Sequence, residues 1–126
     1  MEARSEVSVD LLEACLEAFN RHDLDGVMDF FGPDPVLKMP RGPDPGGRRA
    51  EGRDEVRKLL ATRFEGIPNV HYGDDRHFVC GARGVSEWLL TGTMRDGKEI
   101  RVRGCDLFEF EAGKISVKDS YWKIVE

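Results

Sequence analysis

The 126-residue sequence has few of the residues on which disulfide-linked and metal-binding proteins depend. Its three cysteines, Cys15, Cys80 and Cys105, are widely spaced and include no CxxC pair, so we expect neither a disulfide framework nor a zinc site. We expect all three to be small buried residues, and no nucleophilic role for Cys105, because the neighbouring sequence supplies no base. His71 and His77 lack the spacing of metal-binding motifs, so no metal or other cofactor is expected.

The sequence also lacks an excess of positive charge and any long apolar run. The formal net charge is −5, and nucleic-acid binding requires clustered Lys and Arg, so we expect no nucleic-acid partner. No run approaches the roughly 20 apolar residues of a membrane-spanning helix. The N-terminal stretch MEARSEVSVD is polar and acidic, unlike a secretory signal peptide. We therefore expect no membrane partner and a cytoplasmic location.

The composition that remains is that of one globular domain. Hydrophobic residues make up 40% of the chain and charged residues 34%, which is too apolar for a disordered protein. A chain of this length can bury a core without disulfides or metals. We therefore predict a single domain over residues 1–126.

Apolar periodicity predicts helices in the first half of the chain and strands in the second. Residues at helical spacing predict helices over 8–20, 24–31 and 54–64, the first capped by Ser8 and the second by Asp23. Apolar and β-branched runs predict strands over 36–39, 70–72, 77–80, 85–94, 98–110 and 114–125. Helices followed by an antiparallel meander predict an α+β fold, with the helices packed on one face of a curved sheet.

The stretch PRGPDPGGRRAEG, residues 40–52, is predicted to be a loop because of its prolines and glycines. A loop of this length inside a compact domain is more often functional than idle. We expect Met39 and Arg41 to lie at the mouth of a pocket. There Arg41 either meets an anionic ligand or stays solvated.

An acid stands in an aromatic strand near the end of the chain, in the stretch GCDLFEF. Asp106 shares a strand face with Phe108 and Phe110, because side chains two residues apart point the same way. The EAG turn that follows has two readings. A two-residue loop would put Ala112 at positive φ, whereas a three-residue loop would place Gly113 there as a bulge. We predict the three-residue loop.

The three-residue loop makes Asp106 oppose Lys118. Directly opposed side chains share a face, so the Asp106 face would also carry Phe108 and three residues of the last strand, Ser116, Ser120 and Trp122. Phe108 and Trp122 could stack a planar ligand, although core packing is the commoner fate of such residues. A slip of one residue would instead oppose Asp106 to Asp119.

The RDG turn contains an Asp-Gly pair, which is preferred in two-residue hairpin loops. That loop would make Glu87 oppose Asp106 and would place Leu89 on the same face of the sheet. The predicted pocket then holds Asp106 between Glu87 and Lys118. A carboxyl group in an apolar pocket suits proton transfer at neutral pH, with Asp106 and Lys118 as catalytic residues. The alternative is a structural ion pair near a sheet edge.

These segments resemble the nuclear transport factor 2-like superfamily over essentially the whole chain. The similarity lies in the stretches AFNRHDLDG and EGRDEV and, most specifically, in the closing stretch CDLFEFEAGKISVKDSYWK. The superfamily includes SnoaL-like polyketide cyclases, ketosteroid isomerases and limonene-epoxide hydrolases. The resemblance implies one SnoaL-like domain, in which a cone-shaped, cystatin-like α+β barrel of antiparallel strands wraps around about three N-terminal helices and an apolar pocket.

The resemblance also implies roles for two residues. In SnoaL-like cyclases an acid at the strand position of Asp106 acts as general acid/base, and a polar residue on the last strand assists it. Lys118 stands at that second position, where the cyclases have His. A cofactor-independent cyclase or isomerase acting on a small apolar or polycyclic ligand is therefore implied. Two other functions stay open: a non-catalytic binder of an apolar ligand, and an interaction domain that forms a homodimer through its outer sheet face.

Overall fold

The computed structural model describes residues 7–126, and within them three helices and six strands. The helices are α1 (Val9–Asn20), α2 (Leu24–Met28) and α3 (Arg53–Gly66). The strands are β1 (Phe31–Lys38), β2 (Arg49–Glu51), β3 (His71–Cys80), β4 (Arg83–Thr93), β5 (Glu99–Glu111) and β6 (Lys114–Trp122). The first six residues of the polar N-terminal stretch lie outside the described residues.

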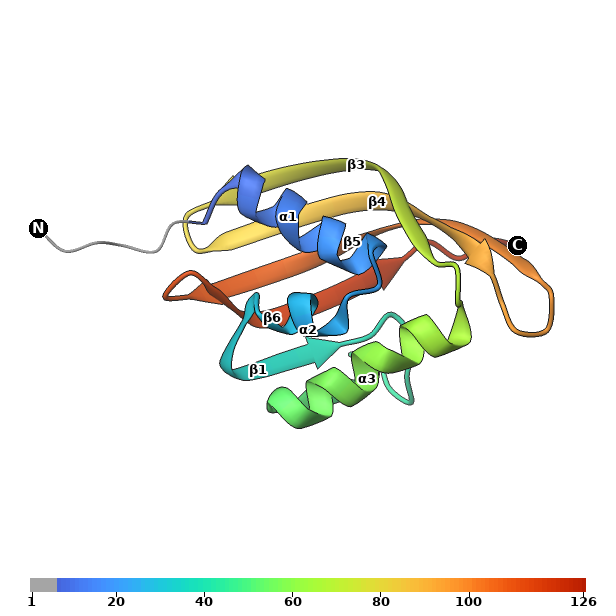
Figure 1. Ribbon diagram of the computed structural model, residues 1–126, viewed down its shortest axis with the longest axis horizontal. Helices are drawn as coiled ribbons and strands as arrows, with labels where there is room; N and C mark the ends of the chain where they lie inside the picture. Colours follow the sequence, from blue (N-terminus) through green and yellow to red (C-terminus); the bar gives the residue numbers. More distant parts are fainter. Residues whose placement is uncertain (1–6) are drawn as a thin grey trace, which may run out of the picture.

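The strands form one curved, open sheet in the order β2-β1-β6-β5-β4-β3. Helix α1 packs on β3, and α3 runs alongside β1 (Figure 1). The predicted α+β class, with helices packed on a curved sheet, is confirmed. One pairing differs from an all-antiparallel sheet, because β1 runs parallel to β6. These strands are far apart in the chain, so no hairpin turn fixes their relative direction.

The first two helices begin at the predicted caps. Ser8 Oγ accepts a hydrogen bond from Leu11 N (3.1 Å), and Asp23 Oδ1 accepts one from Gly26 N (3.0 Å). These bonds satisfy backbone donors that the first turn of a helix leaves free. The second helix ends at Met28, earlier than predicted, and the chain soon enters β1.

Strand β1 begins before the predicted strand and passes through the stretch GPDP. Pro33 and Pro35 fall where β1 changes register against β6, between Phe31 and Val36. Proline cannot donate to a regular strand pairing but is tolerated at such an irregularity. The sequence therefore predicted only the regular second half of this strand.

Strand β2 lies inside the segment predicted to be a loop, residues 40–52, and pairs antiparallel with β1. The loop prediction is wrong for Arg49–Glu51, where only Ala50 is buried, so no apolar pattern marks the strand. The pairing of β2 with β1 leaves residues 39–48 as a short connection between the two strands. Where this connection closes, Arg48 N donates a hydrogen bond to Arg41 O (2.8 Å).

The core lies between the helices and the inner face of the sheet. Its most fully buried large side chains come from both layers: Leu12, Leu37, Val56, Trp88, Leu90 and Ile115. Removing this apolar surface from water is the main driving force for folding. Among residues 7–126, no helix is long and apolar enough to cross a membrane.

Candidate active site

The EAG turn between β5 and β6 is a two-residue loop, so the predicted three-residue loop is wrong. Glu111 pairs with Lys114, and both loop residues adopt positive φ, 51° at Ala112 and 76° at Gly113. Positive φ at both central positions matches the twist of the flanking strands. The strand geometry therefore prevails over the preference of the alanine for negative φ.

This turn changes the partner of Asp106 but not the face on which it lies. Asp106 is opposite Ser120, and Lys118 is opposite Phe108. A β-bulge close to the turn absorbs one residue of β6. The bulge keeps Lys118 and Ser120 on the Asp106 face, because it restores the alternation that the shorter loop would have reversed.

The bulge falls at Ser116, which was predicted to line the pocket. Phe110 pairs with Ile115 and Glu109 with Val117, which leaves Ser116 between them. Ser116 Oγ donates to Glu109 O (3.1 Å) and does not join Asp106. In the predicted register Ile115, three residues before Lys118, would lie on the outer face, but it is buried in the core. Both placements were wrong because no residue pattern around the turn indicated the bulge.

The RDG turn between β4 and β5 is one residue longer than predicted. Met94 N donates to Lys98 O (2.8 Å), and Gly97 N donates to Met94 O (2.9 Å). Gly97 has a φ of 89°, which is typical of a three-residue loop that ends in a glycine bulge. The pairing of β4 with β5 is consequently shifted by one residue from the predicted register.

The shift moves Glu87 and Leu89 to the outer face of the sheet, so their predicted places in the pocket are wrong. Glu87 Oε1 lies 3.2 Å from Arg76 Nη2 at the surface, and Leu89 is half-buried. Their inner-face neighbours Ser86 and Trp88 are buried instead, with Ser86 opposite Asp106. The alternation of Trp88 with Leu90 was the signal that could have identified the inner face.

The structure brings Asp106, Lys118 and Ser120 together and adds Trp88, which sequence reasoning missed. Lys118 Nζ donates to Asp106 Oδ1 (3.0 Å) and to Ser120 Oγ (3.0 Å). Ser120 Oγ donates to the same Asp106 oxygen (2.5 Å). Trp88 Nε1 donates to Asp106 Oδ2 (3.0 Å). Each oxygen of this buried carboxylate therefore has a hydrogen-bond donor, as a charge in a protein interior requires.

The walls around this cluster are apolar and aromatic. Lys118 Nζ lies 5.1 Å from the centroid of the Phe19 ring, and Tyr72 contacts Trp88 edge-on at 4.9 Å. Burial raises the pKa of the Tyr72 phenol and raises that of the Cys15 thiol to about 12. Both groups stay protonated at neutral pH. Neither group therefore adds a charge to the cluster.

A small inner cavity of about 10 Å³ adjoins the cluster. Its lining includes Trp88, Lys118 and Ser120, the three groups that donate to Asp106, while Asp106 lies behind them. The remaining wall comes from α1, α3 and the residue after β1, with Phe19, Leu60, Arg63 and Met39. The space is about what one water molecule needs.

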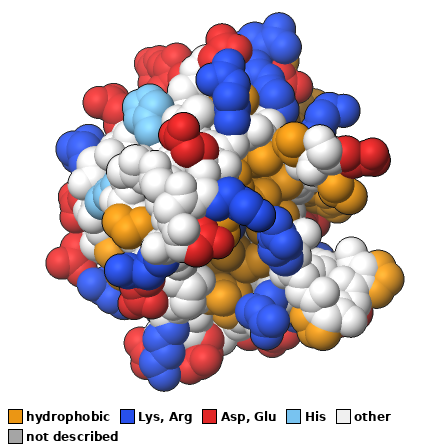
Figure 2. Space-filling view, turned by 90° about the vertical axis from the view of Figure 1, so that its right-hand side faces the viewer, with side chains coloured by type: hydrophobic (Ala, Val, Ile, Leu, Met, Phe, Trp, Pro, Cys, Tyr) orange, Lys and Arg blue, Asp and Glu red, His pale blue; other side chains and the backbone are white. Residues whose placement is uncertain are grey.

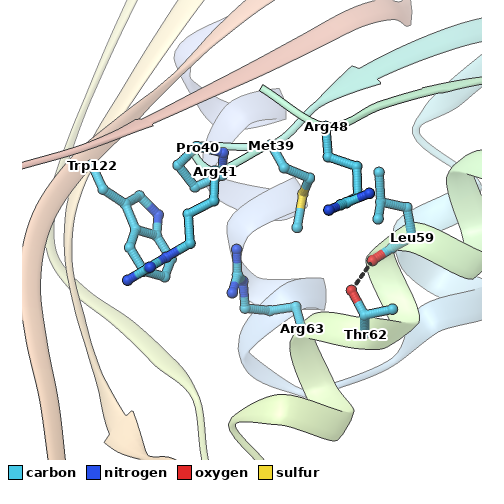
Figure 3. Close-up of a pocket in the computed structure, with 8 residues that line it drawn as sticks. All are labelled: Met39, Pro40, Arg41, Arg48, Leu59, Thr62, Arg63 and Trp122. Atoms are coloured by element: carbon cyan, nitrogen blue, oxygen red, sulfur yellow. Dashed lines mark hydrogen bonds between the residues drawn. The ribbon is translucent and has the colours of Figure 1, made fainter. Parts of the chain in front are cut away.

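Next to the inner cavity lies a larger pocket of about 130 Å³, the mouth pocket. Figure 3 shows the residues that line this mouth pocket. Met39, Arg63 and Trp122 line both spaces and so form the partition between them. Three further lining groups are Arg41, Arg48 and Leu59. The predicted pocket residues Met39, Arg41 and Trp122 are therefore found together at this mouth, whereas Phe108 packs on Phe110 in the core, with ring centroids 5.9 Å apart.

The end of the molecule at which α3 and β6 finish faces the viewer in Figure 2. Hydrophobic side chains are exposed there in a hollow, with Lys and Arg side chains beside it. Arg48 and Arg63 at the mouth pocket were not selected from the sequence. Arg63 lies on a helix whose sequence is rich in charged residues, so nothing in the sequence distinguishes it.

The remaining candidates lie elsewhere. His71 is exposed, and His77 is bonded to Ser86 through Nδ1 (2.8 Å) and to Asp75 through Nε2 (2.7 Å). In the described part of the chain, no three His, Cys, Asp or Glu side chains are grouped as metal ligands. The cysteines differ in exposure: Cys15 is buried, Cys105 is half-buried on the outer face and Cys80 is exposed, so burial was wrongly predicted for Cys80.

Comparison with known proteins identifies the family. The sequence model described as the SnoaL-like domain matches residues 12–117. The chain belongs to the SnoaL-like domain family. No curated protein matches it. The resemblance to the nuclear transport factor 2-like superfamily inferred from the sequence is confirmed.

Solved structures agree on the fold of this SnoaL-like protein. A candidate polyketide cyclase from Xanthomonas campestris superposes with a TM-score of 0.80 at 22% identity, over 90% of this chain and 88% of its own. An NTF2-like protein from Mesorhizobium loti gives 0.76 at 25% identity, over 98% and 97% of the two chains. A protein with a ketosteroid isomerase-like fold from Catenulispora acidiphila, solved with trimethylamine, gives 0.78 at 17% identity, over 94% and 88%.

Proposed function

We propose that this SnoaL-like protein is a cofactor-independent enzyme of the cyclase or isomerase type, in which Asp106 is the general acid/base. The observation that carries this proposal is the buried carboxylate whose three hydrogen-bond donors line an internal cavity below an open mouth pocket. A carboxylate in an apolar pocket accepts and returns protons effectively at neutral pH. Candidate polyketide cyclases share this fold, which supports the proposal.

Ser120 connects Asp106 to a ligand in the cavity. Its hydroxyl accepts from Lys118 and donates to Asp106, which leaves one lone pair toward the cavity. A proton leaving a carbon next to a carbonyl passes to Ser120 Oγ while the serine proton passes to Asp106. The electrons of the broken C–H bond form an enolate, and the same relay returns the proton to a different carbon atom.

Lys118 would stabilise that enolate. Its ammonium lies in the cavity wall and already balances the Asp106 charge, so it can donate to an oxygen on which negative charge develops. A ring-sized ligand exceeds the inner cavity of about 10 Å³. Met39, Arg63 and Trp122 must therefore move apart to admit the reacting part of the ligand.

The test follows exchange of α-protons with deuterium by NMR, using a panel of cyclic ketones and the purified protein. Asp106→Asn should lower the exchange rate by roughly 10²- to 10⁴-fold. Asp119→Asn is the matched control, because Asp119 lies on the neighbouring strand β6, opposite Leu107, and points to the outer face. Wild-type exchange rates in Asp106→Asn would exclude the acid/base role.

A non-catalytic ligand carrier is the second candidate. It is favoured by the position of Asp106 behind its three hydrogen-bond donors, because a purely structural carboxylate would sit in the same way. The same experiment separates the two. A carrier would bind members of the panel and catalyse no exchange.

We also propose that the protein forms a homodimer through its outer sheet face. Phe78, Leu107 and Tyr121 are 51%, 40% and 52% exposed on this face. Phe78 and Leu107 lie in one cross-strand row, joined by Val85 between them. Large apolar side chains exposed in a row on a sheet are typical of surfaces that bind another protein.

A further inference from the structure

The mouth pocket concentrates positive charge on an acidic protein. Three guanidinium groups, those of Arg41, Arg48 and Arg63, line it together with apolar surface from Met39, Leu59 and Trp122 (Figure 3). The three arginines come from the connection after β1, the residue before β2 and helix α3. The whole chain has a formal net charge of −5, so this is a local cluster against the overall charge.

These three arginines differ from their neighbours in having no acidic partner. Arg49, the next residue after Arg48, pairs with Glu51 at 2.6 Å, and Arg57 on α3 pairs with Asp25. No carboxylate among residues 7–126 lies within ion-pair distance of Arg41, Arg48 or Arg63. Like charges held close together repel one another, and an anion between them removes that repulsion.

The protein holds the cluster in place with an aromatic ring and a closed backbone turn. Arg63 Cζ lies 4.6 Å and Arg41 Cζ 5.9 Å from the ring centroid of Trp122. Met39 N donates to Arg48 O and Arg48 N to Arg41 O, both at 2.8 Å, which fixes the two loop arginines across from each other. A planar guanidinium that stacks on a ring keeps its N–H groups free for bidentate contact with an oxyanion.

We infer that the mouth pocket binds the oxyanion of an aromatic carboxylate, with the three arginines around the anion and the ring of the ligand against Trp122 and Met39. The pocket volume of about 130 Å³ is close to that of a cavity that holds one benzene ring. Because Met39, Arg63 and Trp122 also line the inner cavity, a ligand anchored here points its uncharged part toward Lys118 and Ser120. The inference that an aromatic carboxylate is the substrate rests on the proposed function. The inference that the mouth pocket binds such an anion does not depend on that function.

The test compares benzoate with benzamide, its uncharged analogue of the same shape, by NMR titration of the Trp122 indole N–H signal. Benzoate should bind at least about tenfold more tightly than benzamide, the difference expected for charge-assisted bonds. Phenyl phosphate tests the other source of an oxyanion. Tighter binding of phenyl phosphate than of benzoate would overturn the carboxylate assignment.

Two substitutions locate the site. Arg48→Gln removes an exposed side chain and should not affect folding, and Arg63→Gln removes the guanidinium nearest to Trp122. Each should weaken benzoate binding by about tenfold and leave benzamide binding unchanged. Arg49→Gln is the control, because Arg49 is next to Arg48 in the sequence but pairs with Glu51. This variant should bind benzoate like the wild type. Equal binding of benzoate and benzamide, or wild-type benzoate binding by both pocket variants, would overturn the inference.

The Asp106→Asn variant separates this inference from the proposed function. Asp106 does not line the mouth pocket, so the variant should keep the preference for benzoate. If it keeps wild-type α-proton exchange, the proposed function fails while the anion site stands. If the preference for benzoate is missing from the wild type but exchange depends on Asp106, the anion site fails while the proposed function stands.

Discussion

At the scale of single residues, the Asp106–Lys118 pair determines how the site can behave. Both side chains are almost completely buried, at 4% and 7% exposure, so each charge depends on the other for its compensation. Removing one member of such a pair costs about 3–5 kcal/mol, because the other charge is left unpaired. Replacing both with uncharged groups of similar shape is far less costly. The pair can therefore be tested by comparing single and double substitutions.

We predict that Asp106→Asn and Lys118→Met each lower the free energy of unfolding by about 3 kcal/mol. The double variant should lose clearly less than the sum of the two, because it leaves no unpaired charge. Urea denaturation followed by circular dichroism measures all three values. Additive losses would show that the two side chains do not interact as a buried ion pair. Asp119→Asn should change the free energy by no more than about 0.5 kcal/mol, since its side chain is not part of the pair.

At the scale of secondary-structure elements, the two hairpin turns decide which residues reach the site. Both loop lengths were predicted wrongly, one too long and one too short. The error at the turn after β5 was cancelled by the bulge at Ser116, so Lys118 and Ser120 stayed on the Asp106 face. The error at the turn before β5 was not cancelled, so Glu87 and Leu89 exchanged faces with Ser86 and Trp88.

Comparing the sequence-based predictions with the structure shows which features depend only on neighbouring residues. The helix caps Ser8 and Asp23 and the acid in the aromatic strand depend on neighbouring residues, and they were predicted correctly. The bulge, strand β2 and the arginine cluster depend on contacts between distant segments. Arg41, Arg48 and Arg63 come from separate segments, and only the folded chain brings them to one pocket.

The strain in the two-residue turn provides a prediction for β5 and β6. Ala112 has a φ of 51°, a conformation that asparagine and glycine adopt more readily. Ala112→Asn should raise the free energy of unfolding by about 0.5–1 kcal/mol, measured by urea denaturation. Gly113→Ala, at a φ of 76°, should lower it by roughly 1–2 kcal/mol. A stabilising effect of Gly113→Ala would contradict the turn geometry.

At the scale of the whole molecule, the two faces of the curved sheet carry different kinds of side chain. The inner face carries the buried cluster and the mouth pocket, whereas the outer face exposes Leu107 and Tyr121. Because side chains alternate along a strand, substitutions on one face leave the other in place. Assembly and chemistry can therefore be tested separately in this protein.

We predict that Leu107→Glu converts the proposed homodimer to a monomer, because a charge would be buried in the apolar row beside Val85. Size-exclusion chromatography with light scattering measures the mass of each form. Ile124→Glu makes the same chemical change at a residue that is 91% exposed beyond β6, and it should leave the dimer intact. A wild-type protein with the mass of one chain would rule out the dimer.

The parallel pairing of β1 with β6 affects how the protein folds while the ribosome is still synthesising it. Strand β6 carries Lys118, Ser120 and Trp122, and β1 can pair with it only after α3 and the strands β3 to β5 have also been synthesised. At roughly 5–20 residues per second, synthesis leaves β1 waiting for several seconds. During that interval β1 lacks its partner β6, and the side chains of Phe31 and Leu37, which are buried in the folded core, are not yet fully packed. The site is thus assembled only after β6 has been synthesised, and molecular chaperones can bind the unpaired β1 before then.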